Sequence, residues 1–373
     1  MRYINGHNLI IAALVLLAGC GAAQQGATPP APSPGPTSPP AAVAPSPAAT
    51  APARTPQPTP RPSPTSMPTP GPDEFVNPVI DRDFPDPDAL KAGDTYYVYA
   101  TNSGGVNIQS ARSPDLVTWT LLGDALPALP PWARPGFTWA PEVTSWDGGR
   151  SFVMYFTARD AASDKQCIGT ATSARPEGPF TSDAQQALIC QVDQGGSIDA
   201  SAFMDEDGKR YLLWKNDGNC CGFATYIYIQ EVAADGLTLQ GAPTRLITND
   251  QVWEGGLVEA PTLWKHNGKY YLFYSANSYA GVDYAIGYAV ADRPTGPYTK
   301  PVSKPLLATD MKTGAAIGPG GQDIILDREG DTWMLYHSWD PTASYRRLML
   351  DELVWEGDTP VVKGPNKGPQ PKP

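Results

Sequence analysis

The chain has 373 residues and a formal net charge of −11, from 38 acidic and 27 basic side chains. This length exceeds one average domain, and the negative balance argues against nucleic acid as a partner and favours a neutral or cationic one. The composition changes sharply along the chain and divides it into a leader, a linker and a globular part.

The first twenty residues, MRYINGHNLIIAALVLLAGC, have the features of an export signal. Arg2 precedes an apolar run over 9–18 that is too short to remain in a bilayer as a spanning helix. The ending LAGC resembles a bacterial lipobox, which implies that Cys20 is lipidated. We therefore expect 1–20 to be a lipoprotein signal peptide, and the mature protein to be exported and anchored at a cell-surface or periplasmic membrane by this lipid alone. The alternative is ordinary cleavage with loss of Cys20.

Residues 21–72 contain 18 of the 42 prolines of the chain and no aromatic residue. Such a segment buries too little apolar surface to offset its conformational entropy, so we expect an extended, disordered linker. All ten tryptophans lie in the following part, 73–363, which we expect to be globular. The last ten residues, 364–373, are expected to be a disordered tail.

The globular part repeats itself. Five segments, each with an opening strand, a Gly/Asp turn and an aromatic strand, start at Asp86, Trp139, Asp199, Glu259 and Gly321, at intervals of 53, 60, 60 and 62 residues. Examples are DPDALKAGDTYYVYA and EAPTLWKHNGKYYLFYS. Almost no helical periodicity is present, which predicts an all-β fold, and the even spacing favours a five-bladed β-propeller over a β-sandwich or two β-domains.

In a propeller these starts would converge at one mouth of the central channel, which would bring Asp86, Asp199 and Glu259 together. Paired carboxylates suit glycoside hydrolysis, in which one acid protonates the leaving oxygen and one carboxylate acts as base or nucleophile. A third carboxylate nearby would raise the pKa of the acid. Beyond His7 in the leader the chain has only two histidines, His266 and His337. It therefore offers few candidates for the histidine of a serine triad. The competing interpretation is that these acids are turn residues.

Across essentially all of 73–363 the sequence resembles glycoside hydrolase family 43, on the strength of Phe84-Pro85-Asp86-Pro87, SIDASAFMDEDGKRYL and EAPTLWKHNGKYYLFYS in this order. The resemblance implies a five-bladed propeller and an inverting enzyme acting on arabinan, xylan or related polymers. It implies Asp86 as general base, Asp199 as the residue that modulates the pKa of the acid, and Glu259 as general acid. Inversion would require the carboxyls of the base and the acid to lie about 6.5–9.5 Å apart.

The resemblance also implies substrate-binding residues. Trp139 in TWAPE matches an aromatic wall of the sugar pocket, although it also suits a core position. Arg346 in YRRLML matches an arginine that reaches the sugar, and Arg347 would take this role after a slip of one residue. Asn216 in LLWKND is either a sugar contact or a turn residue.

A metal ion is in doubt. Many family members carry a histidine near a GPGH stretch that helps to hold a channel metal or water cluster, whereas this chain reads GPGGQD at 318–323. His337 is either a replacement ligand or a core histidine. We expect no required cofactor, and we leave a structural channel metal open.

The four cysteines of the globular part, Cys167, Cys190, Cys220 and Cys221, can pair in an exported protein, and their spacing does not fix the connectivity.

The stretches QVDQGGSIDAS, LLWKND and GPGGQD resemble the exo-acting arabinofuranosidases of this family more than its β-xylosidases. We therefore expect a monomeric, membrane-tethered, exo-acting α-L-arabinofuranosidase with arabinan- or xylan-type glycans as partners. The alternatives within the class are a β-xylosidase and an endo-1,5-α-arabinanase. The alternatives of another class are a non-catalytic glycan-binding propeller lipoprotein and a structural surface propeller. An intact trio of acids favours an enzyme, because a binding protein does not need a protonated Glu beside an Asp.

Overall fold

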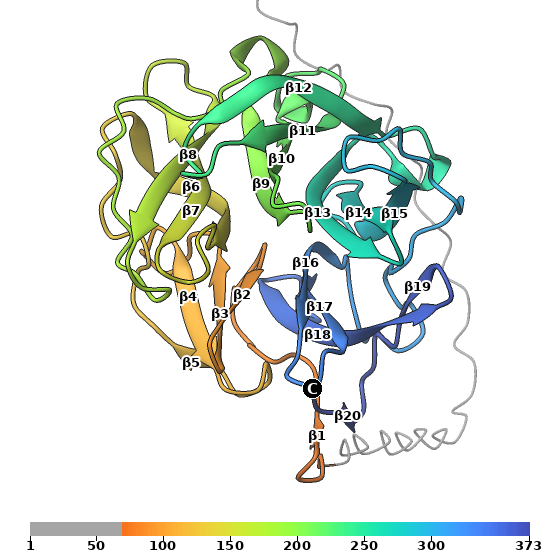
Figure 1. Ribbon diagram of the computed structural model, residues 1–373. Helices are drawn as coiled ribbons and strands as arrows, with labels where there is room; N and C mark the ends of the chain where they lie inside the picture. The colour runs from red at the N-terminus through yellow and green to blue at the C-terminus, as the bar shows by residue number, and fades with distance from the viewer. Residues whose placement is uncertain (1–68) are drawn as a thin grey trace, which may run out of the picture. The chain divides into compact units, whose positions relative to one another are not determined.

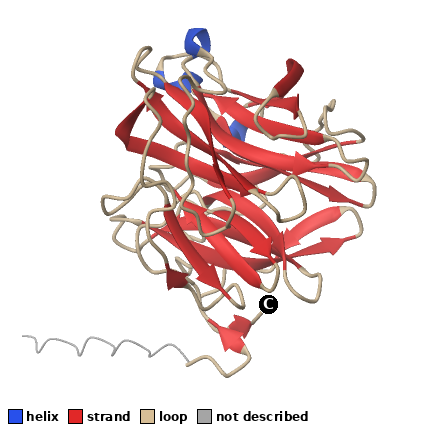
Figure 2. Ribbon diagram, turned by 60° about the vertical axis from the view of Figure 1, so that its left-hand side comes forward, coloured by secondary structure: helices blue, strands red, loops and turns tan. Residues whose placement is uncertain are grey.

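The computed structural model describes residues 69–373, which form a five-bladed β-propeller (Figure 1). The predicted fold class is thus confirmed. Strands dominate this part of the chain, and helical turns are confined to loops (Figure 2). No helix within 69–373 combines the length and hydrophobicity of a membrane span. The predicted signal peptide and nearly all of the predicted linker, 1–68, lie outside the described residues.

Each blade is an antiparallel sheet of three or four strands, and we number the blades I to V along the chain. The strands of blade I are β2 (Asp88–Ala92), β3 (Thr95–Ala100), β4 (Gln109–Ser113) and β5 (Thr120–Leu121). Those of blade II are β6 (Ala133–Thr144), β7 (Phe152–Asp160) and β8 (Gln166–Ser173). Those of blade III are β9 (Ser197–Met204), β10 (Arg210–Asn216), β11 (Tyr226–Val232) and β12 (Leu239–Thr248).

Blades IV and V complete the ring. The strands of blade IV are β13 (Val258–His266), β14 (Lys269–Ala276) and β15 (Ala285–Ala291). Those of blade V are β16 (Gly320–Leu326), β17 (Thr332–Trp339), β18 (Arg346–Glu356) and β19 (Thr359–Val362). Three 3-10 helices lie in the described loops: η1 (Val192–Gln194), η2 (Gly218–Cys220) and η3 (Val252–Glu254).

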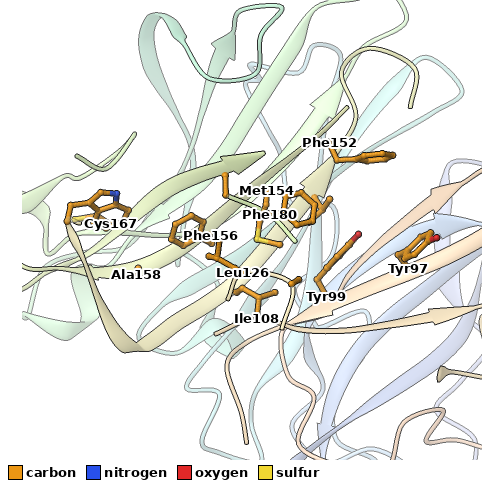
Figure 3. Packing of buried hydrophobic residues seen from close by; sticks show 14 residues of the cluster. Tyr97, Tyr99, Ile108, Leu126, Phe152, Met154, Phe156, Ala158, Cys167 and Phe180 are labelled. Carbon is orange, nitrogen blue, oxygen red and sulfur yellow. The ribbon is translucent and has the colours of Figure 1, made fainter. Parts of the chain in front are cut away.

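The second strand of each blade is apolar on both faces because a neighbouring blade covers each face. In β14, Tyr270, Leu272 and Tyr274 pack in a cluster shared with blade III, whereas Tyr271 and Phe273 pack against blade V. Five such clusters fill the five interfaces between neighbouring blades. Figure 3 shows the cluster between blades I and II. The aromatic runs of the sequence therefore form a ring of cores around the channel.

Two contacts close the ring between its first and last segments. Ile80 forms a β-bridge with Leu348 of β18. Strand β1 (Glu74–Phe75) pairs with β20 (Gln370–Pro371) at the base of the molecule (Figure 1). The expectation of a disordered tail over 364–373 is therefore wrong. Gln370 is buried and its Nε2 donates to the Leu350 oxygen at 3.1 Å, which holds the tail against blade V.

The structure resolves the pairing of the four cysteines that the sequence left open. One disulfide joins Cys167 of β8 to Cys190, which lies just before η1. The other joins the adjacent residues Cys220 and Cys221 at the end of η2.

Candidate active site

The innermost segment of every blade turns left-handed at one position. These positions are Asp86, Ala140, Asp199, Ala260 and Gly321, with φ of 54°, 38°, 57°, 49° and 57°. The expected register of the repeat is therefore off by one residue in blades II and IV, where Trp139 and Glu259 precede the turn. Positive φ is costly for residues other than glycine, and such strain is concentrated at functional sites.

These turns surround the mouth of the channel, where a cavity of about 350 Å³ opens. Five of the six residues proposed from sequence for catalysis and substrate binding line it: Asp86, Trp139, Asp199, Glu259 and Arg346. They come from five different blades, so only the closed ring brings them together. This convergence is what the spacing of the repeat predicted.

Asp86 is held as a carboxylate. Its Oδ2 accepts a hydrogen bond from Thr101 Oγ1 at 2.6 Å, and its Oδ1 lies 3.2 Å from Arg346 Nη1. Burial alone would raise the pKa of Asp86, but the Arg346 charge and the hydrogen bonds outweigh it and hold this pKa well below its usual range. An ionised oxygen is therefore available in the cavity at every physiological pH.

Glu259 and Asp199 share a second charged group, the ammonium of Lys215. Lys215 is fully buried, and its Nζ donates to Glu259 Oε2 at 2.7 Å. Burial opposes the charge on Lys215, but the carboxylates of Glu259 and Asp199 outweigh this and raise its pKa. Burial and the negative charge of Glu259 raise the pKa of Asp199 to about 8. Asp199 therefore keeps its proton at neutral pH, beside the contact between Lys215 and Glu259.

The position of Lys215 beside Glu259 was not anticipated from the sequence. Lys215 ends the run YLLWK of β10, in which the four preceding residues are buried. A lysine that continues a fully buried strand could have been recognised as a functional candidate, because buried lysines are almost always paired.

The two arginines are distinguished by the structure. Arg346 reaches the cavity, where it contacts Asp86 and lies over the Tyr279 ring at 4.8 Å. Arg347 points to the other side of β18 and donates to the Trp339 oxygen at 3.3 Å. The alternative assignment to Arg347 is therefore not supported.

Asn216 does not line the cavity, so its predicted sugar contact is wrong. It is buried, and its amide is used within the protein: Oδ1 accepts from the Tyr226 nitrogen at 2.7 Å and Nδ2 donates to the Ala224 oxygen at 3.0 Å. Asp217 and Asn219, just after it, line the cavity instead.

His337 is a buried core histidine beside Asp86. Burial and the charge of Arg346 lower the pKa of His337, so its ring is neutral and Nδ1 accepts from the Asp86 nitrogen at 3.1 Å. Its buried Nε2 has no hydrogen-bond partner within 69–373. Over the same range no group of three or more His, Cys, Asp or Glu side chains is arranged as a metal site. One free imidazole nitrogen is not a ligand set, and we assign no step to a metal ion.

Comparison with known proteins supports the same family. The model of the family "Glycosyl hydrolases family 43" matches residues 75–360. The crystal structure of a thermostable family-43 glycoside hydrolase aligns with a TM-score of 0.72 and 35% identity, over 80% of this chain and 99% of that one. That of an endo-1,4-beta-xylanase from Bacteroides thetaiotaomicron aligns with a TM-score of 0.68 and 29% identity, over 79% and 99%.

Curated relatives carry several activities. The chain is 28% identical to beta-D-galactofuranosidase xynD of Aspergillus niger, over 75% of this chain and 82% of that protein. It is 29% identical to xylosidase/arabinosidase 43B of Humicola insolens, over 76% and 53%. It is 24% identical to an extracellular endo-alpha-(1->5)-L-arabinanase of Bacillus subtilis, over 74% and 86%. The chain thus spans only about half of the Humicola enzyme.

Proposed function

Because the chain belongs to glycosyl hydrolases family 43, we propose that it is an exo-acting α-L-arabinofuranosidase that releases terminal units from arabinan-type glycans. The observation that carries this proposal is the single cavity lined by Asp86, Asp199 and Glu259. The arabinofuranosyl preference rests on the resemblance of 191–201, 212–217 and 318–323 to the exo-acting arabinofuranosidases of the family rather than to its β-xylosidases. A β-xylosidase and an endo-1,5-α-arabinanase are the alternatives.

The proposed reaction is a single displacement. Asp86, ionised and fixed by Arg346 and Thr101, removes a proton from water as the water oxygen bonds to the anomeric carbon. The bond from this carbon to the leaving oxygen breaks as Glu259, the general acid, donates its proton to that oxygen. Arg346 and Trp139 line the cavity around the sugar.

Inversion at the anomeric carbon is the stereochemical prediction of this mechanism. Water attacks from the side opposite the leaving group, so the first sugar released has the opposite configuration to the substrate. Proton NMR during the first turnovers of an aryl arabinofuranoside reads the configuration directly, before mutarotation. A retained product would show that a carboxylate attacks the sugar, and would remove Asp86 from the role of base.

Substrate class is tested with aryl α-L-arabinofuranoside, aryl β-D-xyloside, aryl β-D-galactofuranoside and linear arabinan. We expect the arabinofuranoside to be hydrolysed fastest, and arabinan to yield single arabinose units from its ends. Preference for the xyloside or the galactofuranoside would replace the proposed substrate within the same family. Release of oligosaccharides from arabinan would indicate endo action. Glycan binding without any turnover would favour the non-catalytic propeller.

We propose further that the protein is exported as a monomer and tethered by a lipid on Cys20, an inference from the sequence of 1–20. In the source organism, radiolabelled fatty acid should enter the wild-type protein and not a Cys20→Ser variant. The variant should also leave the membrane fraction. Equal labelling or equal membrane association of the two proteins would contradict lipidation at Cys20.

A further inference from the structure

The adjacent cysteines Cys220 and Cys221 form a disulfide at the cavity that holds the three acids. Cys220 is exposed and lines this cavity, as does its neighbour Asn219. The proposed mechanism gives this disulfide no role. Its position beside the reacting groups makes it part of the wall that a bound glycan would meet.

Hydrogen bonds and a close contact from blade II hold the loop that carries this wall. The Cys221 and Phe223 nitrogens both donate to the Gly218 oxygen, at 3.0 and 2.9 Å, which folds the loop into a tight turn. From blade II, Lys165 Nζ lies 3.0 Å from Cys221 Sγ. A bond between neighbouring residues also closes a small ring that restricts the peptide between them. A preorganised surface of this kind loses little conformational entropy when a ligand binds.

The chemistry of the wall complements that of the rest of the cavity. Many of the groups that line the cavity are charged, among them Asp217, Lys215 and Arg346. A disulfide has no strong donor or acceptor, and its sulfurs are soft and polarisable. A sugar ring has hydroxyls at its edge and an apolar C–H surface, which needs such a partner. Aromatic side chains usually fill this role.

We propose that the Cys220–Cys221 disulfide is a substrate-binding surface on which the apolar face of the glycan packs, with a terminal pentofuranoside as the ligand class. The inference rests on the proposed glycosidase function, but it concerns recognition rather than the chemical step. The disulfide is a positioning element: it fixes the sugar relative to Asp86 and Glu259 and transfers no proton.

The test compares two double variants of the full chain on the aryl arabinofuranoside. Cys220→Ser/Cys221→Ser should raise KM on the order of tenfold, the effect of losing a small apolar contact in a substrate pocket, with little change in melting temperature. Cys167→Ser/Cys190→Ser is the matched control, because this disulfide lies outside the cavity. It should lower the melting temperature and leave KM unchanged. An unchanged KM in the first variant, with or without lower stability, would overturn the proposal.

A second measurement uses the wild-type protein and therefore does not require that a variant folds. The wild-type protein is treated briefly with a phosphine reductant and a thiol-alkylating reagent, with or without an arabino-oligosaccharide, and alkylation of Cys220 and Cys221 is measured by mass spectrometry. The sugar should slow alkylation at these two residues and not at Cys190. Equal rates with and without sugar would overturn the proposal. If the wild type hydrolyses no glycoside, the proposed function fails, and this protection experiment still decides the binding role.

Discussion

At the scale of single residues, the proposed mechanism depends on Asp86 as the general base. Asp86→Asn should leave a folded protein and lower kcat/KM by about 10²–10⁴-fold, because an amide does not accept the proton of the attacking water. The measurement is hydrolysis of the aryl arabinofuranoside, with circular dichroism as the check of folding. Asp81→Asn is the matched control from the same acidic stretch. Asp81 lies outside the cavity and accepts a hydrogen bond from Tyr345, so its variant should keep normal activity.

Near-normal activity of Asp86→Asn would show that Asp86 serves only the turn at which it stands.

Asp199 and Lys215 should shift the pH–rate profile in opposite directions. Burial and the negative charge of Glu259 raise the pKa of Asp199 to about 8, so Asp199 is protonated at neutral pH. Asp199→Asn removes this carboxyl and leaves Glu259 facing the Lys215 ammonium, so the alkaline limb of kcat/KM should move to lower pH. Lys215→Met removes the charge that favours ionised Glu259, so the limb should move to higher pH. Full pH profiles of the three proteins give the comparison.

Leaving groups provide the control for this interpretation. Activity of Asp199→Asn should fall least on substrates with good leaving groups, because a nitrophenolate needs little protonation. Glu259→Gln should show the same selectivity more strongly. Equal losses on good and poor leaving groups, or limbs that move in the same direction, would mean that Asp199 and Lys215 do not act through Glu259.

The residues found from sequence and those missed differ for a physical reason. Asp86, Asp199 and Glu259 recur near one register of a repeat, so the spacing itself brought them together. Lys215 does not recur, and its role depends on the close approach of β10 to β13, which no spacing within blade III reveals. Asn216 has a side chain that suits a sugar contact, but its amide is already hydrogen-bonded to the backbone of Tyr226 and Ala224.

At the scale of elements, hairpins were predictable and their irregularities were not. The alternation of turns and aromatic strands marks each hairpin. The pairing of β13 with β14 shifts register between Glu259 and Thr262, and that of β6 with β7 shifts between Trp139 and Glu142. The same shift occurs between Ile198 and Ser201 in blade III and between Gly320 and Asp323 in blade V, so the irregularity recurs at the left-handed turn of four blades. Bulges re-aim side chains next to active sites, and here they direct Glu259 toward the cavity.

Helix η3 shows how a buried ion pair fixes a loop. Glu254 is fully buried, its Oε1 lies 2.7 Å from Lys300 Nζ, and it accepts from Tyr274 Oη at 2.6 Å. Glu254→Gln should lower the free energy of unfolding by about 2 kcal/mol, because the buried ammonium loses a charged hydrogen-bond partner and keeps only the exposed Asp250 carboxylate and the Thr248 oxygen. Urea denaturation measures this.

The matched control is Glu206→Gln. Glu206 pairs with Lys265 at 2.9 Å, but its side chain is 83% exposed. An exposed pair of this kind is worth roughly 0–1 kcal/mol. A loss in Glu254→Gln no greater than in this control would show that the η3 pair does not stabilise the fold.

At the scale of the whole molecule, the ring was predictable because near-equal spacing requires equivalent units. Its closure was not. Strand β1 pairs with β20 near the other end of the chain, and Gly364 approaches the buried Asp351 so closely that a Cβ would clash. From the sequence we expected 364–373 to be a free tail, yet the absence of a side chain at Gly364 lets the backbone pass close to Asp351 and return along blade V.

A second layer of acids lies deeper in the channel than the catalytic ones. Asp88, Glu142 and Asp323 each stand two residues after a left-handed turn and line one narrow space. Two of them connect neighbouring blades: Asp323 Oδ2 accepts from the Ala89 nitrogen, and Asp88 Oδ2 from the Val143 nitrogen, both at 2.8 Å. The acids therefore link blades V, I and II around the axis.

Burial, together with mutual repulsion, raises the pKa of Asp88 and Glu142 well above the usual range, and burial raises that of Asp323 to about 6. The folded protein therefore retains protons that the unfolded chain has lost above about pH 4, the ordinary carboxyl pKa. The stabilisation from this layer is complete below that pH and is lost as pH rises through 6 and beyond, on the order of 1 kcal/mol per pH unit for each titrating group.

Urea denaturation between pH 5 and 8 should show stability falling with pH. Asp323→Asn, which keeps an acceptor for Ala89 but carries no charge, should flatten this slope. A slope that is unchanged in the variant, or stability that rises with pH in both proteins, would mean that these acids are ionised in the folded ring and that another charge compensates them.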